Sequence, residues 1–531
     1  MRERWLLSPL AAWASAATLL ISLGFAACGG DSGGEDDTAV PDVEGDATAD
    51  TADGTDTTTS IGDEVYFPVA PPDDVPEVLS GDRWVTHYED DIAPYWLMTE
   101  ALGEPVGNFP TFRGMDGRVL GQSERRPRMI SRQVLGYALG YLLTGDRVLI
   151  EHAQAGADWL RAHAIDRTKG GCHELLTKSG EAAGSVRTAQ DLSYCMTGLA
   201  ALFFVTRDPA IEADLEAARG WIFDPNKYWD ADNGRVRDGL ENDMATEVDV
   251  ENDGGSELVA QLDQINAFML LVQPVMSTEN ARQRFLDGLE TLVGVMVDDF
   301  LKDGIFWGVS NKQGQYGTKH VDWGHTLKSY WMVLQVDKRL ADHPFHDVVF
   351  DQVYTLVDRA FDADNGRWSK RPTSATGVEY GSDWWIYAEE DQLAATLDLI
   401  DHRYTDTLAQ TAGNWLTDYV DQSYEIGEII PGIKRDGSPV WSWGASDSAK
   451  CNQWKSAFHS SEHALVMSIL GQYYDDAEVE LHFAVPAAEV ETFIAKPYTF
   501  DGRVVSREAG ETFTLGGREL TEVTVTFTDL Y

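Results

Sequence analysis

The chain has 531 residues, with 88 Asp and Glu against 41 Lys and Arg, which gives a formal net charge of −47. A protein this acidic is a poor candidate for binding a nucleic-acid backbone or an anionic lipid surface, because both need clustered cations. The hydrophobic fraction of 43% is ordinary, so most of the chain can build a core, and the charge suits a neutral or weakly charged ligand.

The first segment is typical of an export signal. Arg2 and Arg4 precede an apolar run over residues 6–25, and two alanines lead to Cys28. The pattern around Cys28 resembles a bacterial lipobox, which implies cleavage before Cys28 and lipidation of its thiol. A plain signal peptide and an uncleaved membrane anchor are the alternatives. Residues 1–27 are assigned to the signal, and we expect an exported, membrane-anchored protein in the periplasm or on the cell surface.

Residues 28–64 are predicted to form a flexible acidic tether. From residue 29 to residue 64 there are 12 acidic residues, no basic residue and almost no large apolar one. Such a segment cannot bury enough apolar surface to offset the entropy lost on ordering. No later run approaches the roughly 20 apolar residues of a membrane span, so we expect contact with the membrane only through the lipid anchor.

Residues 65–476 are predicted to form one helical domain built from a repeated unit. Similar loops, which combine Gly with acidic or amide residues and aromatics, begin near residues 108, 169, 228, 301, 361 and 430. Between the loops, helical periodicity with apolar residues nearly all round indicates buried inner helices over 131–143, 191–205, 258–276, 324–340, 387–402 and 461–474. More polar segments such as 281–301 and 345–361 are expected to cover them. Six inner and outer pairs predict an all-α fold, an (α/α)6 toroid barrel, with an open α-solenoid as the alternative.

The last part of the chain, residues 477–531, changes to an alternating polar and apolar pattern with Gly turns. This period is typical of strands and predicts a small antiparallel β appendage, which we interpret as a packing or interaction surface. Among the cysteines after the signal, Cys172 and Cys195 could form a disulfide in an exported domain, with buried thiols as the alternative.

Side chains that can carry chemistry gather where the predicted inner helices begin. His325 opens the fourth inner helix after Gly324, with Lys328 one turn later. His459 opens the sixth, and Glu462 follows it at the same spacing. Alone, a histidine in such a place is more often a capping or core residue. Two at equivalent points of a toroid are more informative, because every inner helix would begin at the same cavity.

Two further helix starts carry candidate binding residues. Trp384 and Trp385 open the fifth inner helix and offer a flat apolar wall suited to the face of a sugar ring. Arg132 lies at the start of the first inner helix, which is otherwise apolar. A buried guanidinium must face a partner or a cavity, since an unpaired buried charge is costly.

These motifs resemble those of the N-acylglucosamine 2-epimerase superfamily, which also contains cellobiose 2-epimerases and aldose–ketose isomerases. The resemblance covers about residues 85–475. The matching segments are residues 87–96 with 107–109, Ser131-Arg132-Gln133, Gly324-His325 with Trp331, Trp385 with Glu389, and Trp454-Lys455 with His459. The resemblance implies an (α/α)6 barrel, a mono- or disaccharide substrate, and no obligatory redox cofactor or metal.

The resemblance also implies roles for individual residues. His325 and His459 would be the acid and base, Arg132 would stabilise an enediolate oxygen, and Glu389 would hold sugar hydroxyls or a histidine. Trp385 and Trp454 would stack on the sugar. Removing a proton beside a carbonyl needs such a base near neutral pKa and an electrophile for the growing oxyanion.

Three positions depart from the family pattern. Lys328 stands where the family usually has Glu, and Glu462 stands where it often has Arg. We therefore expect a reversed ion pair between Lys328 and Glu462 across the funnel. Asn266 lies in the stretch where the family often carries a His and a Glu, and an amide cannot relay protons. These three residues are kept as substrate-binding candidates.

The sequence thus predicts a sugar epimerase or isomerase that transfers a proton at C2. Two alternatives stay open. A glycoside hydrolase or lyase on a similar barrel would need paired carboxylates, and Asp383, Glu389, Glu390 and Asp391 are available. A catalytically inactive, sugar-binding surface lipoprotein is the other alternative, because of the departures at Lys328, Glu462 and Asn266.

Overall fold

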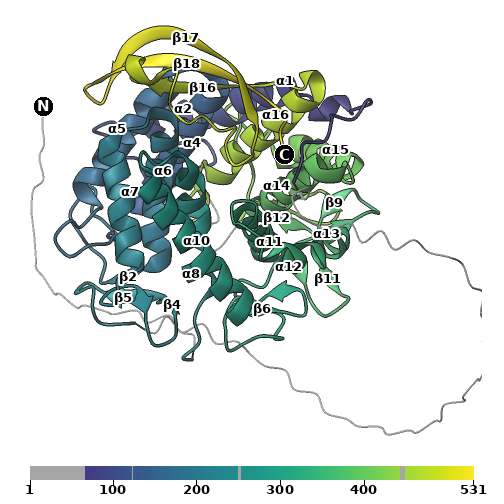
Figure 1. Ribbon diagram of the computed structural model, residues 1–531, viewed down its shortest axis with the longest axis horizontal. Helices are drawn as coiled ribbons and strands as arrows, with labels where there is room; N and C mark the ends of the chain where they lie inside the picture. The colour runs from purple at the N-terminus through teal and green to yellow at the C-terminus, as the bar shows by residue number, and fades with distance from the viewer. Residues whose placement is uncertain (1–65, 122–123, 249–252, 443–448) are drawn as a thin grey trace, which may run out of the picture. The chain divides into compact units, whose positions relative to one another are not determined.

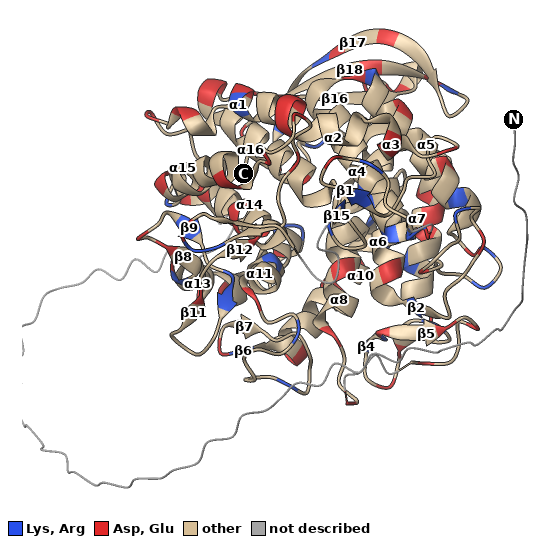
Figure 2. Ribbon diagram, turned by 180° about the vertical axis from the view of Figure 1, so that it is seen from behind, with Lys and Arg blue, Asp and Glu red and all other residues tan. Residues whose placement is uncertain are grey.

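The computed structural model describes residues 66–531 except 122–123, 249–252 and 443–448. The expected signal, the lipidation site Cys28 and the acidic tether lie outside the described residues. Within the described part, none of the helices combines the length and the apolar character that crossing a bilayer requires. Asp and Glu recur on helices and loops throughout the view of Figure 2.

The inner helices lie where the apolar periodicity predicts them, and nearly all their side chains are buried. They are α4 (Pro127–Thr144), α6 (Ala189–Thr206), α8 (Leu258–Gln264) with the π-helical η3 (Ile265–Met269) and α9 (Leu270–Val272), α11 (Trp323–Asp337), α14 (Trp384–Asp401) and α16 (Phe458–Asp476). Helix α4 packs against α6 and α16, α6 packs against α8, and α14 packs against α11 and α16.

The outer helices are amphipathic, and several begin at a side-chain cap. They are α5 (Arg147–His163), α7 (Pro209–Ile222), α10 (Glu279–Phe300), α12 (His346–Phe350), α13 (Val353–Ala360) and α15 (Thr405–Asn414) with η5 (Trp415–Tyr419). Asp146, Asp208 and Thr278 cap α5, α7 and α10 by accepting a hydrogen bond from a backbone N–H of the first turn. Helix α10 packs against both α8 and α11, and so connects two parts of the inner layer.

Short helices precede the first inner helix, and two 3-10 turns occur elsewhere. They are η1 (Glu77–Leu79), α1 (Gly81–Thr86), the π-helical η2 (His87–Ile92), α2 (Ala93–Leu97), α3 (Thr99–Leu102), η4 (Gln273–Val275) and η6 (Ala487–Glu489). Helix α1 packs along α16, so the beginning of the described chain covers its last long helix.

The repeated loops contain small antiparallel strand pairs, which the sequence interpretation treated only as loops. Hairpins are formed by β3 (Trp229–Asp230) and β4 (Arg235–Val236), β6 (Leu301–Lys302) and β7 (Ile305–Phe306), β8 (Phe361–Asp362) and β9 (Arg367–Trp368), β10 (Arg371–Pro372) and β11 (Val378–Glu379), and β13 (Gly432–Ile433) and β14 (Pro439–Val440). Strand β12 (Ser382–Asp383) extends the β13–β14 pair, and β2 (Val186–Thr188) pairs with β5 (Gly239–Glu241). Finally, β1 (Arg113–Gly114) pairs with β15 (Ala449–Cys451), which joins the first and last repeated units.

The strands expected near the C-terminus are present as one antiparallel sheet. Its order is β16 (Val479–Val485), β18 (Arg518–Thr528) and β17 (Arg503–Leu515). Strand β16 packs against α4, α6 and α16, so the sheet shares the core of the helices. Figure 1 shows this sheet at one end of the helices, with β2, β4, β5 and β6 at the opposite end.

The chain is therefore mainly helical, with short strand pairs and a terminal sheet, and it is compatible with the expected six-unit helical fold. The disulfide considered between Cys172 and Cys195 is wrong for this structure. Within the described residues, Cys172, Cys195 and Cys451 are free, buried thiols.

Candidate active site

A cavity of about 420 Å³ opens where the inner helices begin. Early residues of α6, α11, α14 and α16 line it, together with Arg132 of α4, Leu262 and Asp263 of α8, and the loop over residues 317–322. The candidates named from the sequence that line it are Arg132, His325, Lys328, Asp383, Trp384, Trp385, Trp454 and His459. Early residues of five inner helices and the last turn of α8 thus line one space.

His325 is held by a carboxylate at the start of its own helix. Asp322 is the N-cap of α11 and accepts a hydrogen bond from the His325 backbone N–H at 2.8 Å. The same carboxylate lies 2.8 Å from Nδ1 of the His325 ring. Burial lowers the pKa of His325, but the charge and hydrogen bonds of Asp322 outweigh burial and hold the pKa above its usual value. His325 is therefore biased toward its protonated form, and its ring lines the cavity.

His459 lies in a contrasting environment. Its ring stacks on Phe458, with ring centroids 4.3 Å apart. Nδ1 of His459 comes within 3.4 Å of Oε1 of Glu389, yet among the described residues it has no partner in hydrogen-bond geometry. Burial first, and then the cations Lys328 and Arg132, lower the pKa of His459 well below its usual value. His459 is therefore biased toward its neutral form.

The indole of Trp385 contacts both imidazoles. Its ring centroid lies 4.9 Å from that of His325, in an edge-on contact, and 6.2 Å from that of His459. The two histidines thus flank one aromatic side chain that itself lines the cavity. A planar ligand placed against this wall would meet a protonated and a neutral imidazole.

The ion pair expected between Lys328 and Glu462 is wrong, because each residue has another partner. Nζ of Lys328 donates to Oε1 of Glu389 at 2.5 Å, and both side chains are buried. Glu462 instead accepts a hydrogen bond from the hydroxyl of Tyr498, in the segment between β16 and β17. Burial opposes the charge of Lys328, but Glu389 outweighs burial and raises the pKa of the ammonium. Glu389 therefore supplies the negative partner.

Arg132 faces aromatic rings rather than a carboxylate. Its guanidinium lies 3.7 Å from the centroid of the Tyr194 ring, and Nη1 donates to the backbone carbonyl of Trp454 at 3.0 Å. Burial lowers the pKa of Arg132. A buried cation on the cavity wall is suited to stabilise an oxyanion of a ligand.

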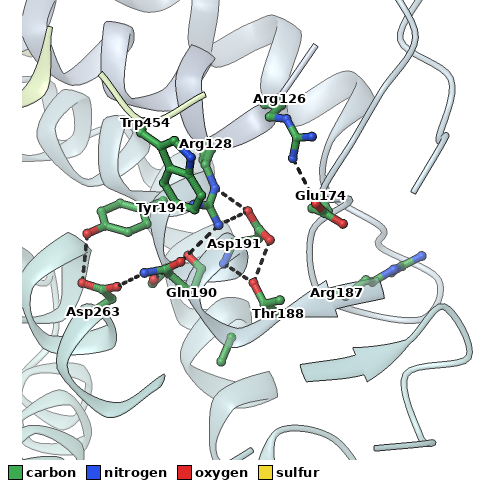
Figure 3. Close-up of polar contacts among 12 residues, drawn as sticks. Arg126, Arg128, Glu174, Arg187, Thr188, Gln190, Asp191, Tyr194, Asp263 and Trp454 are labelled. Atoms are coloured by element: carbon green, nitrogen blue, oxygen red, sulfur yellow. Dashed lines mark hydrogen bonds and ion pairs between the residues drawn. The ribbon is translucent and has the colours of Figure 1, made fainter. Parts of the chain in front are cut away.

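Several cavity residues were missed by sequence reasoning, among them Asp263, Tyr194 and Gln190. The Tyr194 hydroxyl donates to Oδ1 of Asp263 at 2.9 Å, and Nε2 of Gln190 donates to Oδ2 at 2.9 Å (Figure 3). Asp263 is the one charged residue of α8. A charged residue in a mainly apolar helix is the feature that identified Arg132 in the sequence, and the same feature could have identified Asp263.

A second, smaller cavity of about 190 Å³ adjoins the first and shares Gln190 and Trp454 with it. In Figure 3 the Arg128 side chain lies beside the Trp454 indole and bonds Asp191. The Arg128 guanidinium carbon is 4.7 Å from the centroid of the Trp454 ring, and Nη2 is 2.5 Å from Oδ1 of Asp191. The Trp454 side chain is 39% exposed, so it stands between the two spaces as an accessible aromatic face.

Three candidates do not line either cavity in the described structure: Asn266, Glu389 and Glu462. Asn266 lies in the π-helical η3, about one turn after Leu262 and Asp263 in the chain. Glu389 and Glu462 are buried behind the wall, and Glu389 acts on the cavity through Lys328 and His459. No group of three or more His, Cys, Asp or Glu side chains is placed to hold a metal ion within the described residues.

No protein-family model matches the sequence, and no curated protein matches it either. The fold is similar to that of cellobiose 2-epimerase from Spirochaeta thermophila DSM 6192, with a TM-score of 0.62 and 16% identity over 73% of this chain and 96% of that one. Cellobiose 2-epimerase from Bacillus thermoamylovorans B4167 gives a TM-score of 0.62 at 13% identity, over 73% of this chain and 98% of that one. A D-mannose isomerase gives 0.61 at 17% identity, over 74% and 98%. The chain thus shares its fold with solved sugar epimerases and isomerases.

Proposed function

We propose that the protein is a sugar 2-epimerase or aldose–ketose isomerase that moves a proton at C2 of a reducing mono- or disaccharide. The observation that carries this proposal is the pair His325 and His459, which flank Trp385 and are biased toward opposite protonation states. Two titratable groups whose environments push their pKa values apart are the usual arrangement of an acid and a base.

In this mechanism the neutral His459 removes the proton beside the sugar carbonyl, and the enediolate that forms carries negative charge on oxygen. Arg132 lies on the same cavity wall and stabilises that oxygen. The protonated His325 then delivers a proton. Delivery to the opposite face of C2 yields the 2-epimer, whereas transfer between C2 and C1 on one face yields the ketose.

The wall also offers contacts for a neutral sugar. Trp385 and Trp454 present aromatic faces that suit the apolar face of a pyranose ring. The Asp263 carboxylate and the Gln190 amide supply hydrogen-bonding groups for hydroxyls. The structural neighbours, named as cellobiose 2-epimerases and a D-mannose isomerase, support a reducing sugar as the substrate class.

The carboxylates of the cavity do not favour a glycoside hydrolase. Asp322 is bound to His325, Asp383 lies 3.1 Å from Nζ of Lys370, and Asp263 accepts from Tyr194 and Gln190. A hydrolase needs one carboxyl of raised pKa beside the glycosidic bond. The buried Glu390 has a raised pKa, but it lies outside the cavity lining of the described residues.

We also propose that a lipid on Cys28 holds this domain outside the cytoplasm, as the sequence pattern implies. Cys28→Ser in the full chain is expected to move the protein from the membrane fraction to the soluble fraction. An unchanged distribution would contradict lipidation at this thiol.

The proposed function is tested by NMR in D₂O with D-mannose, N-acetyl-D-glucosamine and cellobiose. Deuterium entering C2 of one of these sugars is the expected result. New reducing ends from cellobiose would indicate a hydrolase, and chemical-shift changes without turnover would indicate a binding protein. Either of these outcomes would overturn the proposal.

A further inference from the structure

The segment between β16 and β17 inserts one aromatic residue among the inner helices. Tyr498 is only 4% exposed, and its ring meets Phe204 of α6 edge-on, with ring centroids 6.3 Å apart. Its hydroxyl donates to Oε1 of Glu462, which lies one turn after His459 on α16. The C-terminal part of the chain therefore reaches the residues directly behind the cavity wall.

The backbone of Tyr498 is strained in order to make this contact. Its φ is 61°, in the left-handed region that a bulky residue rarely adopts. Neighbouring contacts hold the segment in place, because Asp501 pairs with Lys496 and lies 3.4 Å from Nζ of Lys338 at the end of α11. Strain of this kind persists where the surroundings over-determine a conformation, and it is concentrated at functional sites.

Glu462 belongs to a buried group of two carboxyls and one ammonium. The groups that act on it are Glu389 of α14, Lys328 of α11 and Tyr498, with His459 on its own helix. Burial first, and then the charge of Glu389, raise the pKa of Glu462 to about 7, whereas the Tyr498 hydrogen bond lowers it. Two neighbouring carboxyls cannot both ionise cheaply. Burial also raises the pKa of Glu389, but the ammonium of Lys328 opposes this shift and favours the ionised form of Glu389. Glu462 is hydrogen-bonded to Tyr498 and is therefore the member assigned the proton exchange near neutral pH.

We propose that Tyr498 is a positioning residue of the sugar site, which fixes the Glu462 carboxyl against Glu389 and thereby controls the charge that His459 meets. The activity arm of this inference rests on the proposed function; the structural arm does not. When Glu462 loses its proton, the added negative charge behind the wall raises the pKa of His459. The pKa of His459 starts well below its usual value, so the ring stays neutral and becomes a stronger base, and turnover is expected to rise as pH rises through the Glu462 ionisation.

The structural arm is tested by titration, without any substrate. The ¹³C carboxyl signal of Glu462 and the ¹³Cε1 signal of His459 are followed against pH in the full-length protein, with Glu462→Gln and His459→Gln used for assignment. Tyr498→Phe removes a hydrogen bond that favours the carboxylate, so the Glu462 midpoint is expected to rise by about 0.5–1 pH unit. The His459 signal is expected to report the same shift.

Tyr141→Phe is the matched control, because Tyr141 is another buried tyrosine whose hydroxyl bonds the C-terminal sheet, at the Phe483 carbonyl and 3.2 Å away. It is expected to leave both midpoints unchanged. If Tyr498→Phe also leaves them unchanged, or if Tyr141→Phe moves them equally, the inference is overturned.

The activity arm follows C2 exchange in D-mannose and cellobiose against pH. In Tyr498→Phe, the rise of kcat through the Glu462 ionisation is expected to move to higher pH with the Glu462 midpoint, while Glu462→Gln removes this rise. An unchanged pH profile with a shifted Glu462 midpoint would overturn the link to catalysis. Absence of exchange in the unmodified protein would overturn the proposed function alone, because the titrations still decide the role of Tyr498.

Discussion

The walls formed by α11 and α16 present the same residue type to the cavity in opposite states. His325 and His459 each lie in the first turn of an inner helix. The α11 wall adds Asp322 beside the ring, whereas the α16 wall is faced by Lys328 and Arg132. One carboxylate at one site and two cations at the other therefore separate an acid from a base. The comparison teaches that the neighbours of a histidine, rather than its place on the helix, decide its role.

Removing the proposed base, His459, should have the largest effect on activity. His459→Ala is expected to lower C2 deuterium exchange by roughly 10²–10⁴-fold, the usual contribution of a general base, while sugar binding survives. Exchange is measured by NMR in D₂O, and binding by calorimetry with the same sugar. His152→Ala, on the outer helix α5, is the control expected to keep exchange. Full exchange in His459→Ala would exclude this residue from the mechanism.

Lys328 of α11, which faces the α16 wall, should affect stability strongly. Lys328→Met leaves Glu389 as a buried carboxylate without its ammonium, which costs about 3–5 kcal/mol of unfolding free energy. Urea denaturation measures the loss, and adding Glu389→Gln should recover part of it. Lys312→Met removes the exposed pair with Asp253 and should cost less than about 1 kcal/mol. Equal losses in the two single variants would contradict the buried pair.

The carboxylate of the α11 wall sets the pH range of the acid. The pKa of His325 is raised in the folded protein, so its acidic form, and the activity that depends on it, are lost as pH rises through that pKa. Asp322→Asn removes the charge but keeps an oxygen that can cap α11. The alkaline limb of kcat/KM is therefore expected to move to lower pH, with a loss of roughly tenfold above neutral pH. If the alkaline limb of kcat/KM does not move, the ionisation that causes it belongs to a group other than His325.

The smallest effect on activity should come from replacing Trp454, which lines both cavities. Trp454→Ala removes an exposed aromatic face, whose stacking is worth roughly 0.5–1.5 kcal/mol. KM is expected to rise a few-fold while kcat stays within about twofold, since Trp454 lies outside the acid and base pair. A large fall in kcat would show that Trp454 acts on Arg132, whose guanidinium donates to its carbonyl.

Much of the helical layout could be predicted because the inner helices are buried on every side. The segments around Leu135, Leu199 and Leu465 read as apolar over several turns, and each lies within a long helix. The strand pairs could not be predicted in this way, because strands of two residues, such as β6 and β8, have no period to detect. Their turns are visible only as glycines, such as Gly366 with φ of 62°.

The candidate site could be predicted only in part. His325 and His459 could be named because helix starts converge in a toroid, and the structure brings both to one cavity. The lowered pKa of His459 depends on burial and on contacts such as that with Lys328 of α11, which sequence spacing does not reveal. The mistaken pairing of Lys328 with Glu462 has the same origin. Glu389 reaches Lys328 from α14, and Tyr498 reaches Glu462 from beyond the last helix.

The convergence of helix starts on the cavity has an electrostatic consequence. Aligned peptide dipoles leave a partial positive charge at the first turn of a helix, worth about 0.3–1 kcal/mol to a nearby anion. The starts of α6, α11, α14 and α16 all line the cavity. Their summed field favours an enediolate and opposes a proton on His459, the second residue of α16. The backbone of a chain with a net charge of −47 can thus contribute a positive electrostatic potential to the cavity.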